Sequence, residues 1–163
     1  MTLNTKQLSL KTKLTSPILF KLFCLIKIPM LALTGVRVVE LSKISATTSV
    51  PFKHLNKNPF KSMYFAVQAM AAELSTASLV MLALEEFDES IAYIVTNCEA
   101  SFTKKANDKI YFTTVDYELI KSGITKAIAS GESVEVKMCT TGKMKNDIAV
   151  ASFSFTWSFK KRN

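Results

Sequence analysis

A single carboxylate, that of Glu73, lies in the middle of a long apolar segment. Within residues 56–86 the other two acidic residues, Glu85 and Glu86, come at the end, where they can reach water. An ionised and unpaired carboxylate in an apolar site is costly, so it needs a partner or keeps its proton. A carboxyl group whose pKa is raised in this way suits base catalysis near neutral pH. Glu73 therefore has either a chemical task or a structural role as an acid hydrogen-bonded inside a dimer core.

The segment that positions Glu73 is predicted to be a helix over residues 62–86, preceded by a polar turn. Its large apolar side chains occupy nearly the whole circumference, whereas a surface helix shows one apolar stripe. At about 1.5 Å per residue the helix would span roughly 37 Å. We expect it to be the buried axis of the fold, wrapped by an element as wide as a curved sheet.

Length and composition predict one domain. The chain has 163 residues, enough to bury a core without disulfides or metals, and we expect a flexible segment over residues 1–15 followed by a single domain over residues 16–163. The hydrophobic fraction is 48% and the mean hydropathy is +0.21. This excess of apolar residues predicts an oligomer interface, in a homodimer or homotetramer.

Cysteine and histidine usage excludes several kinds of site. The three cysteines show no C-x-x-C spacing, which argues against a disulfide framework and a zinc site and favours the reducing cytoplasm. His54 is the only histidine, so no multi-histidine metal site is available and few routes to a catalytic triad remain. We expect no metal and no cofactor, and a carboxylate mechanism is favoured by elimination.

The net charge of +8 makes an anionic partner plausible. Only two of the 21 basic residues are Arg, where proteins that read nucleic-acid grooves rely on Arg, so no nucleic-acid partner is expected. The apolar segment from Ser16 to Leu33 is interrupted by Lys21 and Lys27, which argues against a membrane span. We predict an amphipathic helix with Ser16 as N-cap that packs on the body of the protein. Membrane association is the less favoured alternative, because a basic helix of this kind can lie on lipid.

The rest of the chain predicts an α+β domain with an antiparallel sheet. Residues 36–41 and 43–52 are rich in β-branched residues, and residues 91–105 and 109–117 suggest two strands joined as a hairpin. A short helix is expected between Asp116 and Gly131. Strict alternation of apolar and polar residues over 134–139 and 149–159 predicts the final two strands.

The run from Asn58 to Leu74, NPFKSMYFAVQAMAAEL, resembles the hot-dog acyl-CoA thioesterases, and in particular an uncharacterised branch of that superfamily. In that family an Asn precedes the central helix, His-Gly-Gly starts it, and an acidic residue follows about two turns later. Here Asn58, the triplet beginning at Tyr64, and Glu73 take those places. The resemblance implies a long central helix wrapped by a curved antiparallel sheet.

The same resemblance implies roles for individual residues. Glu73 would act as a base on water or as a nucleophile on the thioester carbon, and Asn58 would orient the water or the substrate. The backbone N–H groups of Tyr64 or Phe65 would hold the oxyanion. Contacts with substrate would come from Gln68, Thr76 and His54.

Each of these residues also has a simpler interpretation. Asn58 precedes a proline and can start a turn, Thr76 can donate back to a helix carbonyl, and His54 can be a solvated loop residue. Gln68 can satisfy backbone groups across an interface. Phe65 and Ala66 stand where the family has glycines, which favours a non-catalytic module that binds an acyl chain or fatty acid as the alternative function. A hydratase of the same fold is disfavoured, because such sites usually pair Asp with His.

Overall fold

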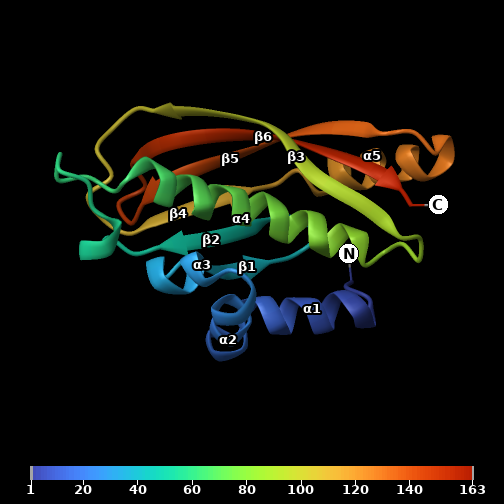
Figure 1. Ribbon diagram of the computed structural model, residues 1–163, viewed down its shortest axis with the longest axis horizontal. Coiled ribbons are helices and arrows are strands. Elements are labelled where there is room, and N and C mark those ends of the chain that lie inside the picture. The colour runs from blue at the N-terminus through green and yellow to red at the C-terminus, as the bar shows by residue number, and fades with distance from the viewer. Residues whose placement is uncertain (1, 163) are drawn as a thin grey trace.

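The computed structural model describes residues 2–162 and has an α+β architecture. A six-stranded antiparallel sheet has the strand order β1-β2-β4-β5-β6-β3, and a long helix, α4, lies across it (Figure 1). The elements in chain order are α1 (Thr5–Thr15), α2 (Pro17–Lys27), α3 (Pro29–Thr34), β1 (Arg37–Leu41), β2 (Ala46–Val50), η1 (His54–Asn56), α4 (Phe65–Leu84), β3 (Ile91–Phe102), β4 (Ile110–Thr114), α5 (Tyr117–Ser130), β5 (Val134–Met144) and β6 (Ala149–Lys161).

The long central helix is confirmed, with Tyr64 as its N-cap residue. It is long and apolar enough to cross a bilayer, but its most apolar window is 67% buried, as in the core helix of a folded domain. The sheet covers it as predicted, but one face of α4 is less covered than the others. There a line of side chains stays half-buried, and we call it the open stripe of α4; it comprises Ala66, Ala69, Met70, Glu73, Ala77 and Met81.

The predicted hairpin between residues 91–105 and 109–117 is wrong, although both strands exist. β3 pairs with β6 at the edge of the sheet, and β4 lies between β2 and β5. The residues that join β3 to β4 instead cross the start of α4, where Ala106 accepts a hydrogen bond from the Met63 amide at 2.7 Å. The alternation in the last two strands is confirmed, and β6 pairs with both β5 and β3.

Within the N-terminal segment that was predicted to be flexible, residues Thr5–Thr15 form the helix α1. Asn4 and Gln7 form a capping box at the start of α1. The Gln7 side chain is fully buried and its Nε2 donates to the Leu82 carbonyl and to the Tyr117 hydroxyl, each at 2.9 Å. One polar side chain thus fastens α1 to the C-terminal part of α4 and to α5.

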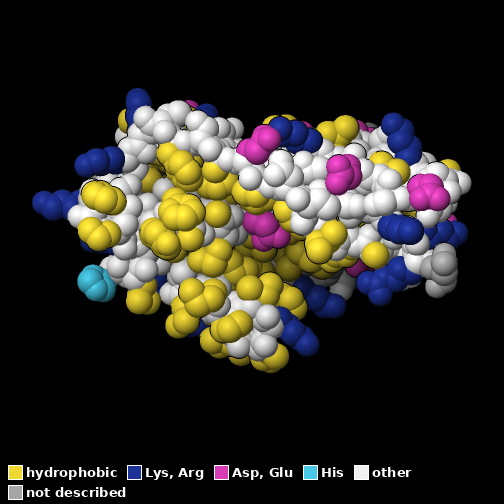
Figure 2. All heavy atoms as spheres, turned by 45° about the horizontal axis from the view of Figure 1, so that its top comes forward, with side chains coloured by type: hydrophobic (Ala, Val, Ile, Leu, Met, Phe, Trp, Pro, Cys, Tyr) yellow, Lys and Arg dark blue, Asp and Glu magenta, His cyan; other side chains and the backbone are white. Residues whose placement is uncertain are grey.

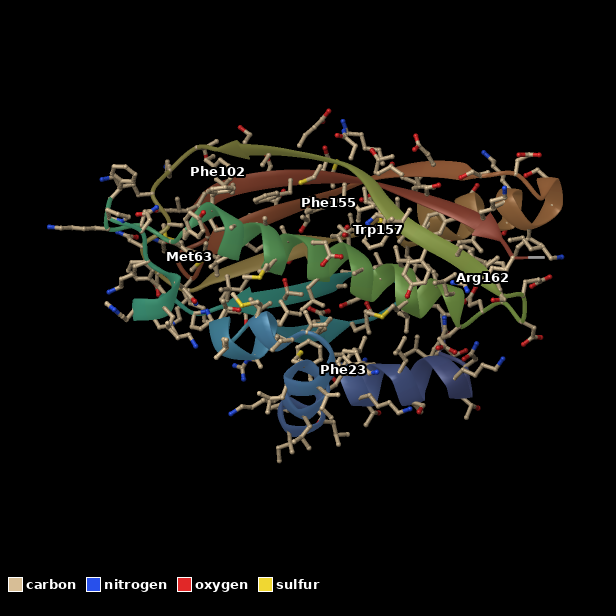
Figure 3. All side chains as sticks on the ribbon, viewed as in Figure 1. Phe23, Met63, Phe102, Phe155, Trp157 and Arg162 are labelled. Atoms are coloured by element: carbon tan, nitrogen blue, oxygen red, sulfur yellow. The ribbon has the colours of Figure 1, made fainter. Side chains whose placement is uncertain are left out.

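The helix predicted after Ser16 is confirmed, with Ser16 as its N-cap, but its packing differs from the prediction. Only Phe20 and Cys24 of α2 are buried. The other apolar side chains of α2 face outward, and Figure 3 shows side chains of α2 projecting away from the sheet. Pro29 ends this helix and begins α3, and Gly35 follows in the left-handed conformation.

The helix expected between Asp116 and Gly131 is α5. Gly131 ends it with φ of 72°. Asp116 does not cap it through its side chain, because the Asp116 carboxylate accepts from the Cys139 amide at 2.8 Å. The aspartate therefore ties the start of α5 to strand β5.

Candidate active site

The Glu73 side chain lies in an apolar hollow of about 250 Å³ beside the open stripe of α4. Figure 2 shows a hollowed surface of mostly apolar side chains on this face of the molecule. Within residues 2–162 the Glu73 carboxylate forms no hydrogen bond and no ion pair, and burial raises its pKa. The hollow is lined by Ile28, Leu31, Met70, Glu73, Leu74, Ala77, Met81, Tyr93 and Trp157.

Thr76 holds the backbone beneath the hollow. Its Oγ1 donates to the Glu73 carbonyl at 2.9 Å and accepts from the Trp157 indole N–H at 3.1 Å. Trp157 reaches α4 from strand β6 (Figure 3). Thr76 is fully buried and bonds with the backbone of Glu73, so the structure favours the positioning interpretation over contact with substrate.

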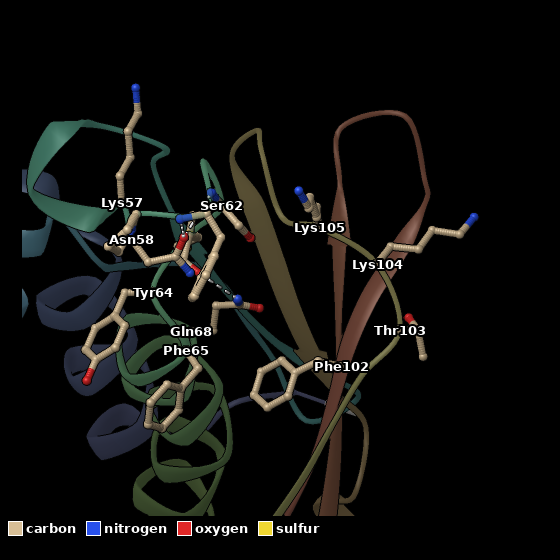
Figure 4. Close-up of a pocket in the computed structure, with 13 residues that line it drawn as sticks. Lys57, Asn58, Ser62, Tyr64, Phe65, Gln68, Phe102, Thr103, Lys104 and Lys105 are labelled. Carbon is tan, nitrogen blue, oxygen red and sulfur yellow. Dashed lines mark hydrogen bonds between the residues drawn. The ribbon is translucent and has the colours of Figure 1, made fainter.

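A second and larger cavity, of about 870 Å³, opens at the start of α4 (Figure 4). It brings together four of the residues predicted from the sequence, namely Asn58, Tyr64, Phe65 and Gln68. Aromatic side chains from two parts of the chain meet in it, since the Phe65 and Phe102 rings are 6.4 Å apart in an edge-on arrangement. Three lysines also line it, namely Lys57, Lys104 and Lys105, and no motif in the sequence links Lys57 with the other two.

The amides at the start of α4 divide into occupied and free donors. The Tyr64 amide, one of the two predicted oxyanion donors, donates instead to the Asn56 carbonyl at 2.8 Å. The amides of Val67 and Gln68 both donate to the Tyr64 carbonyl. No side chain caps this helix. Within residues 2–162 the backbone N–H groups of Phe65 and Ala66 therefore have no hydrogen-bond acceptor, as is usual for the first amides of a helix.

Asn58 and Gln68, which line this cavity, also form hydrogen bonds that stabilise the local backbone. Asn58 Oδ1 accepts from the amides of Phe60 and Ser62, at 3.0 and 3.2 Å, which is the turn role that was its alternative. Gln68 is 4% exposed, and its Nε2 donates to the Met63 carbonyl at 3.1 Å. The Oε1 of Gln68 is buried with no hydrogen-bond partner in residues 2–162.

His54 and Asn56, the first and last residues of η1, differ in burial. His54 is exposed in η1 and lines neither cavity. Asn56, which was not predicted, is fully buried and donates from Nδ2 to the carbonyls of Thr34 and Pro51. Its backbone carbonyl receives the Tyr64 amide, so Asn56 fixes the turn that leads into α4.

The carboxylate and the free amides do not meet within one chain. Glu73 is eight residues beyond Phe65 on α4, about 12 Å along the helix axis. The two residues line different cavities. An arrangement that uses both therefore requires a second element to bring them together.

Comparison with solved structures gives the fold its name. A Pseudomonas aeruginosa protein of unknown function, described as a probable thioesterase, superimposes with a TM-score of 0.74 at 21% identity, over 92% of this chain and 99% of that one. Thioesterase HI1161 from Haemophilus influenzae gives 0.66 at 12% identity, over 93% and 95% of the two chains. The chain has the hot-dog fold.

A third solved structure, a protein of unknown function from Chlorobaculum tepidum, superimposes with a TM-score of 0.75 at 13% identity, over 93% of this chain and 99% of that one. No protein-family model matches the sequence, and no curated protein matches it. The likeness therefore concerns the hot-dog fold, and the chemistry has to be argued from the residues of this chain.

Proposed function

We propose that this hot-dog protein hydrolyses acyl-CoA-type thioesters, with Glu73 as the catalytic carboxylate. The observation that carries the proposal is the unpaired Glu73 carboxyl group, whose pKa is raised by burial in an apolar hollow. A buried charge without a partner destabilises a fold, so its presence on the central helix suits a chemical task. The description of similar structures as thioesterases supports the same reaction class.

The reaction needs a base, an oxyanion site and a route for one proton. As base, Glu73 takes a proton from water while the water oxygen attacks the thioester carbon. The carbonyl oxygen becomes negative and accepts from the Phe65 and Ala66 amides at the positive end of the helix. When the C–S bond breaks, the leaving thiolate takes the proton from Glu73. Direct attack by the carboxylate, followed by hydrolysis of the anhydride, is the other route open to this residue.

Two copies of the chain can bring the separated parts together. Ala69 lies on the open stripe of α4 four residues from Phe65 on one side and four from Glu73 on the other. A twofold axis that crosses α4 at Ala69 would set Glu73 of one copy opposite Phe65 of the other. The small side chain at that point permits close approach of the two helices.

The sheet edge next to α4 supports the same twofold arrangement. β3 has 12 residues and pairs only with β6 among the described strands, so its outer edge presents free backbone groups. Tyr93 of this strand lines the hollow of Glu73. Pairing of β3 with its copy would extend the sheet and cover the open stripe. We accordingly propose a homodimer as the active form, in the cytoplasm.

The test compares the wild type with Glu73→Gln on short, medium, long and aromatic acyl-CoAs. Removal of a general base should lower kcat by about 100-fold or more. Glu118→Gln is the matched control, because Glu118 is an exposed glutamate on α5 and should keep full activity. Undiminished turnover in Glu73→Gln would reject the mechanism.

A non-catalytic acyl-chain-binding module is the second candidate. The exposed Phe65 side chain stands at the start of α4, where a thioester carbonyl would approach the amides. The large cavity beside it is lined by Phe60, Tyr64 and Phe102 and suits an acyl chain. Co-purified fatty acid detected by mass spectrometry, with no turnover of any acyl-CoA in the panel, would select this function.

A further inference from the structure

The outward face of α2 carries several highly exposed large apolar side chains. Ile18 is 73% exposed, Ile26 is 77% exposed, and Leu22 is 54% exposed. Other large apolar side chains of α2 and α3 extend the same exposed surface, and we call the whole set the α2 face: Ile18, Leu19, Leu22, Phe23, Leu25, Ile26, Ile28, Met30 and Leu33. Contiguous apolar surface of this kind marks a site of contact with another molecule.

The N-terminal helices carry charge of one sign. Residues 1–39 hold six basic residues and no acidic one, whereas residues 40–163 hold the other 15 basic residues and all 13 acidic ones. Lys21 and Lys27 interleave with the apolar residues of α2 and are exposed. Neither lysine belongs to an ion pair among residues 2–162. The N-terminal helices therefore combine apolar side chains with unpaired positive charge.

This combination discriminates between a lipid surface and a second copy of the chain. A twofold contact of α2 with itself would bring Lys21 and Lys27 against the same lysines, with no acidic residue in α1–α3 to compensate. In a bilayer with anionic headgroups, leucine and phenylalanine side chains can insert into the hydrocarbon region. The lysine side chains can extend to the headgroups, whose negative charge attracts them. The surface chemistry fits the bilayer.

We propose that the α2 face docks this protein peripherally on anionic lipid surfaces, which is the less favoured alternative that the sequence left open for this helix. The helix lies in the interface with its apolar residues inserted and its lysines at the headgroups. Ile28, at the C-terminal end of α2, also lines the hollow that holds Glu73. Docking therefore sets the edge of that hollow formed by Ile28 next to the lipid surface, although the proposal stands whether or not Glu73 is catalytic.

The test is co-sedimentation of the full chain with vesicles of phosphatidylcholine, with and without phosphatidylglycerol. The wild type should pellet with the anionic vesicles and stay in solution with the neutral ones, and added salt should release it. Replacing both Lys21 and Lys27 by Gln should weaken binding by about fivefold per lysine. Lys126→Gln on α5, also exposed, is the charge control and should bind as the wild type does.

A matched pair of variants tests the apolar contribution. Leu22→Glu should abolish vesicle binding, whereas Leu119→Glu, at a leucine of α5 that is 50% exposed, should retain it. Both positions are exposed on helices, so both variants should keep the wild-type thermal midpoint. Size-exclusion chromatography with light scattering is run in parallel. The proposal would be overturned if the wild type bound neither vesicle or bound both equally. It would also be overturned if Leu22→Glu changed the molecular mass while the wild type did not bind vesicles, and that result would assign the α2 face to contact between copies.

Discussion

The indole N–H of Trp157 donates to the Thr76 hydroxyl at 3.1 Å, and this hydrogen bond joins the last strand of the sheet to the central helix. Both residues are buried. Because Thr76 donates onward to the Glu73 carbonyl, the bond also fixes the stretch of backbone that carries the candidate carboxylate.

Thr76→Val should destabilise the fold while leaving substrate affinity nearly unchanged. The substitution deprives the buried indole N–H of its acceptor, which should lower the free energy of unfolding by about 1–3 kcal/mol. Urea denaturation measures the loss. Thr125→Val, at an exposed threonine of α5 that also donates to a helix carbonyl, should change it by less than about 0.5 kcal/mol. A large rise in KM with unchanged stability would instead place Thr76 at the substrate.

Glu73→Gln should raise stability at neutral pH. Burial raises the pKa of Glu73, so the folded state holds the proton more tightly than the unfolded state and stability falls as pH rises from the ordinary glutamate pKa through the raised one. The neutral amide escapes this loss. Thermal midpoints across pH should show the gain at neutral pH and its disappearance below the ordinary pKa. A variant less stable than the wild type at neutral pH would mean that the carboxylate has a stabilising partner.

The same raised pKa should appear in the kinetics. Glu73 acts as a base only when ionised, so kcat/KM should rise with pH through the raised pKa. A profile measured on one acyl-CoA substrate checks this, and the residual activity of Glu73→Gln should lack the same ascending limb. An unchanged limb in the variant would assign it to another group.

Cross-linking tests the twofold contact at Ala69. With the exposed Cys98 and Cys139 replaced by Ser, Ala69→Cys should form a disulfide-linked dimer on mild oxidation, because a residue on a twofold axis meets its own copy. Non-reducing electrophoresis measures the product. Thr125→Cys in the same background should stay monomeric under these denaturing conditions. A dimer in solution whose Ala69→Cys variant does not cross-link would exclude this axis.

Glu86 should make the free energy of unfolding fall as the pH is lowered. Burial alone would raise the pKa of Glu86, but hydrogen bonds from Lys121, Lys43 and Tyr117 lower it to about 2. Its contribution is therefore complete above the ordinary glutamate pKa and is lost as pH falls toward 2. Urea midpoints of the wild type should fall over this range more steeply than those of Glu86→Gln. Parallel curves for the two proteins would show that the ion pairs do not form in solution.

Local signals in the sequence predicted most of the elements. Alternation of apolar and polar residues located β5 and β6, and Ser16 and Gly131 marked helix ends where the structure has them. The buried acidic residue on α4 stood out for the same reason, since one charge in an apolar helix is visible without any knowledge of what packs around it. These features depend on neighbours that are close in the chain.

Features that depend on distant neighbours were not accessible in this way. Nothing near Gln7 in the sequence reveals that its amide reaches Leu82 and Tyr117, so α1 was expected to be flexible. The strands β3 and β4 are consecutive and suggested a hairpin, yet each has its partners elsewhere. The occupation of the Tyr64 amide likewise depends on how the turn at Asn56 folds back, and composition says nothing about it.

The place of β6 in the sheet has a consequence for how the protein is made. This strand comes last along the chain, yet it lies inside the sheet, with β5 on one side and β3 on the other. During synthesis β3 leaves the ribosome some fifty residues before β6, the strand it pairs with among the described residues, and until then both of its edges are unpaired. We expect the nascent chain to depend on chaperones until residues 149–161 emerge, and a chain that lacks them to aggregate.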